Sequence, residues 1–156
     1  MAQFDLKLEH VFSYNATLTP PELIGPVPDN IRANIYVLGG DVWTPDGTKI
    51  GKVKGVGGDW LTVRRDNKGQ LDVRATVETF DGALLYVTYS GFVDLGERGY
   101  ENLLKGKFPA SAQVRATPQI CTSSPAYEWV NGCQFVNIGE VSFDKNFITY
   151  DTYVIR

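Results

Sequence analysis

Apolar and polar side chains alternate along most of the chain, and the alternation begins near the N-terminus. Successive residues of a β-strand point to opposite faces, so alternation predicts a strand with one buried face. In the first such segment, residues 6–18, one side carries Leu6, Leu8, His10, Phe12, Tyr14, Ala16 and Leu18. Similar patterns predict eight further strands, over residues 31–38, 48–54, 60–65, 70–80, 83–93, 111–120, 133–143 and 146–155.

The segments between these strands are rich in turn-forming residues. Asp66-Asn67-Lys68-Gly69 and Asp81-Gly82 are typical of hairpin turns, and Thr44-Pro45-Asp46-Gly47 predicts another tight reversal. Residues 18–30 contain four prolines, which exclude a helix interior or a central strand. That stretch is therefore predicted to be a connector with polyproline-like pieces. Short helices are predicted over residues 97–105 and 124–130.

No fixed-period repeat, low-complexity tract or linker divides the chain, so residues 1–156 are predicted to form one domain. Apolar residues make up 43% of the chain, enough for a substantial core. About nine strands joined by hairpins favour a barrel or sandwich over a layered α/β fold. We therefore expect an all-β fold, a single antiparallel barrel with one or two short helices.

Charge and hydropathy exclude several classes of protein. The net charge is −3 and the 15 Lys and Arg residues are scattered, so nucleic acid is not an expected partner. No apolar run approaches the roughly 20 residues of a membrane span, so no membrane partner is expected. The N-terminal residues have no basic region before an apolar segment, and therefore do not form a signal peptide. A cytoplasmic location is expected.

Few residues are available for metal or disulfide chemistry. Cys121 and Cys133 form no C-x-x-C motif, and both are expected to be unpaired, buried thiols. His10 is the only histidine, so a multi-histidine metal site cannot be built. The glycine-rich residues 55–59 lack the lysine and the following helix of a phosphate loop. No metal site or cofactor is predicted.

The segment 70–79 carries apolar residues on one face and the charged residues Asp72, Arg74 and Glu78 on the other. This pattern has two interpretations. The charged face can lie in water, where its ion pairs have little energetic weight. It can instead line a barrel cavity, because a ligand-binding barrel needs a few placed polar groups inside.

Other candidate site residues lie on neighbouring segments. Arg115 interrupts an otherwise uncharged strand, so it is either paired with a carboxylate or reaches for an oxygen of a ligand. Either Tyr86 or Tyr89 faces the same side as Arg74, because the two tyrosines lie on opposite faces of their strand. The second predicted helix adds a cluster that would cap the barrel or close a pocket mouth: Tyr127, Trp129 and Asn131.

Five short motifs together resemble one known family, called DUF3237. They are Gly57-Gly58-Asp59-Trp60, Leu71-Asp72-Val73-Arg74, Asp81-Gly82-Ala83 with Tyr86, Arg115-Ala116-Thr117-Pro118 and Tyr127-Glu128-Trp129-Val130-Asn131. The resemblance covers most of the chain from about Leu8 onward, and it implies a barrel similar to the calycins, the lipocalin-like superfamily. The chain departs from the family pattern at Gln113 and Val114, where aromatic residues are common.

The resemblance also implies an activity, because some fungal members look like cyclases of aromatic polyketide pathways. There, a phenol hydroxyl adds to a prenyl alkene and closes an oxygen ring. The first hypothesis is therefore a cofactor-independent cyclase or isomerase for a small aromatic or apolar substrate. Adding a hydroxyl to an alkene needs an acid and a base. The residues given catalytic roles are Asp72 and Glu78, for acid and base, and Arg74 and Arg115, for holding a phenolate.

The residues given substrate-binding roles are Trp60, Tyr86, Tyr127, Trp129 and Asn131. Aromatic side chains among them would stack on a substrate ring and on a developing cation. Two alternatives stay open. One is a non-catalytic barrel that binds or carries a small molecule. The other is a structural role through an exposed face, which would predict a filled interior and a homo-oligomer.

Overall fold

The computed structural model describes residues 1–156 and contains ten strands, one α-helix and one 3-10 helix. The strands are β1 (Leu8–Leu18), β2 (Glu22–Pro26), β3 (Ile31–Trp43), β4 (Lys49–Val53), β5 (Gly58–Val63), β6 (Lys68–Thr79), β7 (Leu84–Asp94), β8 (Ser111–Cys121), β9 (Phe135–Ser142) and β10 (Phe147–Ile155). The helices are α1 (Gly99–Leu104) and η1 (Glu128–Gly132). Neither helix is long and apolar enough to cross a membrane.

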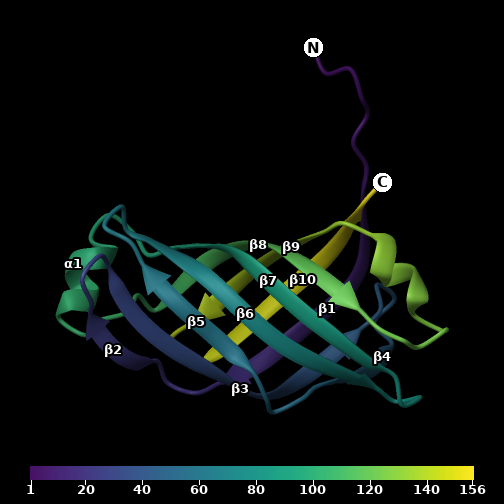
Figure 1. Cartoon of the computed structure of the whole chain (residues 1–156), viewed down its shortest axis with the longest axis horizontal. Helices are drawn as coiled ribbons and strands as arrows, with labels where there is room; N and C mark the ends of the chain where they lie inside the picture. Colours follow the sequence, from purple (N-terminus) through teal and green to yellow (C-terminus); the bar gives the residue numbers. More distant parts are fainter.

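The strands close into an antiparallel barrel, which confirms the predicted fold class (Figure 1). The hydrogen-bonded order runs β1-β10-β9-β8-β7-β6-β4-β3, and β1 pairs with β3 to complete the circle. Two extra strands complete the sheet: β5 bridges β3 and β6, and β2 extends β3 at its edge. Closure removes most free strand edges and leaves one concave interior.

Alternation along each strand separates the interior from the outer surface. In β8 every second residue is buried, and in β6 the residues Leu71 and Val73 point inward. The buried apolar side chains form one core cluster of 27 residues that includes the largest fully buried side chain, Phe135. The apolar face of each strand therefore covers the inside of the barrel, and the polar face is in water.

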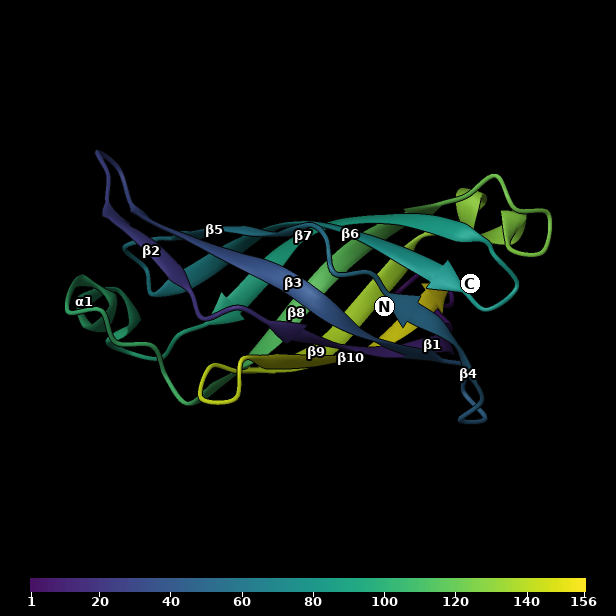
Figure 2. The same cartoon turned by 90° about the horizontal axis from the view of Figure 1, so that it is seen from below.

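The two helices cover opposite ends of the barrel (Figures 1 and 2). Helix α1 follows β7 and buries Leu103, and η1 follows β8 and buries Val130. The first seven residues extend away from the barrel beside the C-terminus (Figure 1). Their apolar side chains, such as Phe4 and Leu6, are exposed.

One strand was not predicted. Residues 18–30 contain β2, which pairs with β3 but has no strand on its other side. The prolines exclude a central strand and permit an edge strand, because a proline at an edge removes no interior ladder bond. Both cysteines are free, as predicted, but neither is fully buried: Cys121 is exposed because it lies on the outer face at the end of β8, and Cys133 is half-buried.

Candidate functional site

The interior of the barrel holds a cavity of about 90 Å³. It is lined by 30 residues, 24 of them hydrophobic, contributed by most of the strands. An apolar cavity of roughly 150 Å³ can hold benzene, so even a single ring would enter this smaller cavity only if wall side chains moved or part of the ring stayed outside. The polar residues on this wall determine what chemistry the cavity supports.

Asp59 is the only acidic or basic residue among those that line the cavity. It lies on β5 and has the same strand parity as the buried Leu61 and Val63. The β5–β6 ladder is interrupted after Asp59, and its Oδ1 accepts a hydrogen bond from the backbone N–H of Asp72 at 2.9 Å. That is the only hydrogen bond to this carboxyl, so its second oxygen is free.

The environment of Asp59 keeps its carboxyl protonated at unusually high pH. Burial is the largest cause and raises the pKa to about 7, because the charged form loses hydration. The Asp72 amide and the charge of Arg32 lower the pKa, and the Asp72 carboxylate raises it, but burial outweighs these effects. At neutral pH the group therefore exchanges between the acid and the carboxylate.

Three tyrosines line the cavity together with Asp59: Tyr14 on β1 and Tyr89 on β7, which are half-buried, and Tyr150 on β10, which is buried. The Tyr14 and Tyr150 rings are 5.1 Å apart, and the Tyr89 ring packs edge-on against Tyr150 at 5.7 Å. Burial is the main reason that the pKa of each tyrosine lies well above its usual value. The Asp59 charge raises the pKa of Tyr89 and of Tyr150 further, and all three side chains line the same cavity.

Two uncharged polar residues complete the cluster. Asn137, on β9, is fully buried and donates a hydrogen bond from Nδ2 to the Tyr14 hydroxyl at 2.6 Å. The hydroxyl of Thr152, on β10, donates to Asn137 Oδ1 at 2.7 Å. Both side chains line the cavity, and their hydrogen bonds fix the Tyr14 hydroxyl in place.

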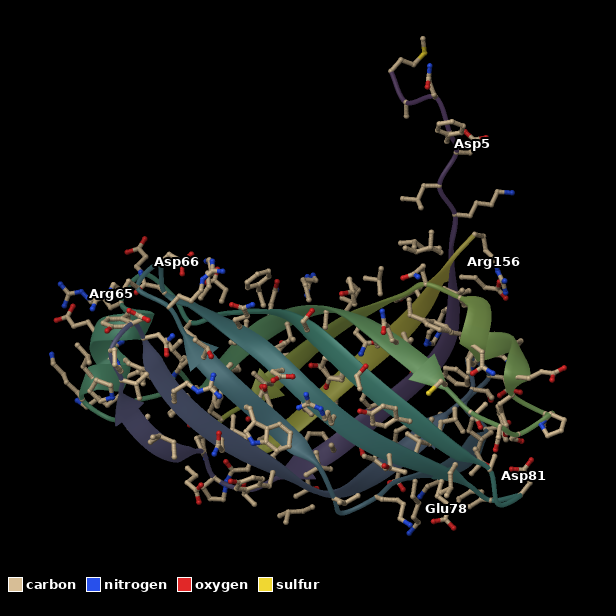
Figure 3. The ribbon with its side chains drawn as sticks, viewed as in Figure 1. Asp5, Arg65, Asp66, Glu78, Asp81 and Arg156 are labelled. Atoms are coloured by element: carbon tan, nitrogen blue, oxygen red, sulfur yellow. The ribbon has the colours of Figure 1, made fainter.

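The four residues predicted to be catalytic do not line this cavity. Asp72 and Arg74 lie on the outer face of β6 and form an exposed pair at 3.5 Å. Glu78 pairs with Lys54 at 3.3 Å, and Figure 3 shows its side chain pointing away from the barrel. Arg115 is exposed on β8 and donates hydrogen bonds to the backbone oxygen of Val114 and to Gln113.

Of the two interpretations of residues 70–79, the structure agrees with the one that places the charged face in water, and the one that places it on the cavity wall is wrong. Barrel closure turns the other face inward, because burying Leu71 and Val73 is favourable while burying unpaired charges is costly. The catalytic roles given to these four residues stay predictions, and the position of the cavity does not support them.

The five predicted substrate-binding residues are also outside the cavity wall. Trp60 lies on the outer face under the Arg74 guanidinium, 5.6 Å from it, and Tyr86 is exposed on β7. The other three lie around η1: Tyr127 packs on the core, Trp129 stacks on Phe12 at 5.7 Å, and Asn131 binds the backbone of Thr122. Phe12 lines the cavity, so Trp129 is near one end of it.

The exposed Asp72–Arg74 pair leads to a first prediction. Asp72→Asn or Arg74→Gln should change the free energy of unfolding by no more than about 1 kcal/mol, because solvent screens exposed ion pairs. Urea unfolding of each variant measures this quantity. A loss of several kcal/mol would contradict the exposed position of the pair.

Asp59, Tyr14 and Tyr150 were not among the predicted site residues, although the sequence pattern contained a signal for Asp59 and Tyr150. Asp59 shares its parity with Leu61 and Val63, and Tyr150 shares its parity with Ile148 and Thr152. A polar side chain at an inward position of a strand is a stronger indication of a site than a charged outer face.

Comparison with known proteins agrees with this fold. The family model described as "Protein of unknown function (DUF3237)" matches residues 6–155, almost the whole chain. The chain belongs to the DUF3237 family. A UPF0311 protein of Rhodopseudomonas palustris, RPA1785, is 27% identical over 154 residues, which cover 96% of this chain and 97% of that protein.

Two solved structures of enzymes share the fold of this DUF3237 protein. One is an enzyme from Penicillium herquei, with a TM-score of 0.69 and 24% identity, covering 100% of this chain and 98% of that one. The other is a nonspecific heme-binding cyclase that catalyses a cycloaddition in neoabyssomicin biosynthesis, with a TM-score of 0.50 and 14% identity, covering 98% and 64% of the two chains. At these identities the likeness is one of fold.

Proposed function

We propose that this DUF3237 protein is an acid–base cyclase or isomerase that transforms a compact, mostly apolar substrate inside the barrel, with Asp59 as the group that transfers the proton. The observation that carries the proposal is one carboxyl, with a free oxygen, facing a cavity whose wall is mostly apolar. An enzyme and a cyclase among the structural neighbours support it at the level of fold.

Asp59 is suited to this role by elimination among the groups on the wall. The ionisable side chains that line the cavity are Asp59 and the three tyrosines. The tyrosines have a pKa well above the usual value and stay protonated at neutral pH. Asp59, with a pKa of about 7, is the group that can both give and take a proton there.

The reaction that we propose follows the family resemblance: a phenol hydroxyl adds to a prenyl alkene in the same molecule. The Asp59 carboxylic acid gives its proton to one alkene carbon, and the hydroxyl oxygen bonds to the other. The hydroxyl proton then passes to Asp59 and restores the acid. The C=C π bond and the O–H bond break while C–H and C–O bonds form, so substrate and product have the same composition.

The cavity limits the size of the substrate. Its volume of about 90 Å³ is below that of typical pockets for larger ligands, which are roughly 300–1,000 Å³. A substrate with several rings would have to move wall side chains or leave part of itself outside. A single-ring prenylated phenol is the smallest compound that carries both reacting groups, so it requires the least movement of the wall and is the appropriate test compound.

The decisive experiment incubates the protein with ortho-prenylphenol in D₂O and follows ring closure by NMR. We expect one deuterium in the product, on the carbon that receives the proton. Asp59→Asn should lower kcat by about 10²–10⁴-fold, the usual contribution of a positioned acid or base. Asp94→Asn, an exposed carboxyl at the end of β7, is the matched control and should retain wild-type turnover.

Two results would contradict the proposal. Turnover that survives in Asp59→Asn would remove Asp59 from the mechanism. Tight binding of the compound without turnover would favour the alternative function, a barrel that binds or carries a small molecule.

A further inference from the structure

The hydroxyl of Tyr150 is buried and lacks a well-formed hydrogen bond, although the Tyr89 hydroxyl lies beside it. The residue is only 3% exposed and points from β10 into the cavity. Its ring is held in place from behind, because Gly139 on β9 lies so close that any side chain there would overlap it. A buried hydroxyl without a partner costs about 1–3 kcal/mol, so its position calls for a functional explanation.

The hydrogen bonds among the neighbouring polar side chains form a chain in which each group donates to the next. Thr152 donates to Asn137, and Asn137 donates to the Tyr14 hydroxyl, so the hydrogen of Tyr14 is directed elsewhere. The Tyr89 hydroxyl lies near those of both Tyr14 and Tyr150. Tyr150 therefore lies at the far end of this cluster, and its O–H remains available as a donor.

Asp59 supplies a hydrogen-bond acceptor on the same cavity wall. Its second carboxyl oxygen has no hydrogen bond, and its charge acts on the Tyr150 hydroxyl. A free donor and a free acceptor therefore face one small apolar space. A hydroxyl group can accept and donate at the same time, whereas a ketone or an ether can only accept.

We propose that Tyr150 donates a hydrogen bond to a ring hydroxyl of the ligand and that this hydroxyl donates to Asp59. Tyr150 and Asp59 together therefore select a ligand with a hydroxyl over one with a methyl group of similar size. The inference rests on the proposed function, since it places the reacting hydroxyl beside the proton-transferring carboxyl. It adds Tyr150 as the residue that binds and orients the substrate oxygen.

The test compares two ligands that differ in one group, para-chlorophenol and para-chlorotoluene, by calorimetric titration. At pH 8, where Asp59 is mostly ionised, wild-type protein should bind the phenol at least about tenfold more tightly, because hydrogen bonds to charged groups contribute about 1.5–3 kcal/mol. Tyr150→Phe should lose most of this preference while binding the toluene as well as wild type does. Tyr153→Phe, on the outer face of the same strand, is the control and should keep the preference.

Equal affinity of wild-type protein for the two ligands would overturn the inference without use of any variant. A full phenol preference in Tyr150→Phe would also overturn it. If ring closure of ortho-prenylphenol still depends on Asp59 in that case, the proposed function stands and only the role of Tyr150 is lost. The melting temperature of Tyr150→Phe is expected to be no lower than that of wild type, since the substitution removes a buried hydroxyl that lacks a well-formed hydrogen bond.

Discussion

Replacing Asp59 with asparagine is expected to stabilise the protein at pH 8 by up to about 4 kcal/mol and to leave its stability nearly unchanged at pH 4. The pKa of this carboxyl rises from 3.8 to about 7 on folding, mainly through burial. Each pKa unit corresponds to about 1.4 kcal/mol, so a shift of about three units gives the upper figure. Asparagine keeps an oxygen that can accept the hydrogen bond from the Asp72 amide.

The sign of this pH dependence follows from the number of protons that the folded and unfolded states bind. Between about pH 4 and pH 7 the folded protein holds a proton on Asp59 that the unfolded chain has lost. Stability therefore falls as the pH rises through this window and is lowest, for this group, above pH 7. The uncharged asparagine has no such penalty. The ionisable groups of other strands that act on this carboxyl are present in both proteins, so their own contributions to stability largely cancel in the comparison. They are Asp72, Arg32, Tyr89 and Tyr150.

Urea unfolding of wild type and Asp59→Asn at several pH values between 4 and 8 measures this difference. Asp94→Asn is the control, because its carboxyl is exposed and its removal should bring no gain at pH 8. A difference between wild type and Asp59→Asn that does not change with pH would show that the carboxyl is not desolvated. The expected gain in stability with loss of turnover is typical of a group retained for function.

Replacing Gly57 with alanine is expected to destabilise the fold by more than about 3 kcal/mol. Gly57 has a φ of +85°, a left-handed conformation that costs an L-residue about 1–2 kcal/mol. A Cβ at this position would also overlap the backbone oxygen of Arg74 on β6, which cannot move without breaking the barrel wall. The same turn positions Asp59, so the substitution should also weaken ligand binding.

Gly47 provides a matched control for this effect. It also has a φ of +85°, but a Cβ there would meet nothing within 4 Å. Gly47→Ala should therefore lose only the conformational cost of about 1–2 kcal/mol. Denaturant unfolding of both variants separates the two contributions. Equal losses would show that the close contact between Gly57 and β6 has no energetic weight.

Much of the fold follows from the sequence because it depends on local patterns. Alternation over segments such as 70–80 and 111–120 predicts strands, and these segments form β6 and β8. Turn residues such as Asp81-Gly82 mark the reversals between strands. The β2 strand is the exception, since its five residues are held by pairing with β3 rather than by any pattern of their own.

The candidate site was not predictable in the same way. Alternation shows that Leu71 and Asp72 face opposite sides, but both assignments of inside and outside satisfy the pattern. Only closure of the barrel decides between them, because the face that becomes concave loses its water. The charged face of β6 consequently lies outside, and the interior carboxyl is Asp59.

The sequence by itself determined nine of the ten strands, the barrel class and, away from the bulge between His10 and Phe12, which side chains share a face of a strand. The tertiary structure alone decided which of these side chains meet. Asp59, Tyr89 and Tyr150 come from β5, β7 and β10, and their proximity depends on how far each strand is shifted against the next around the barrel. That shift is a property of the closed sheet as a whole, so no single segment of sequence encodes it.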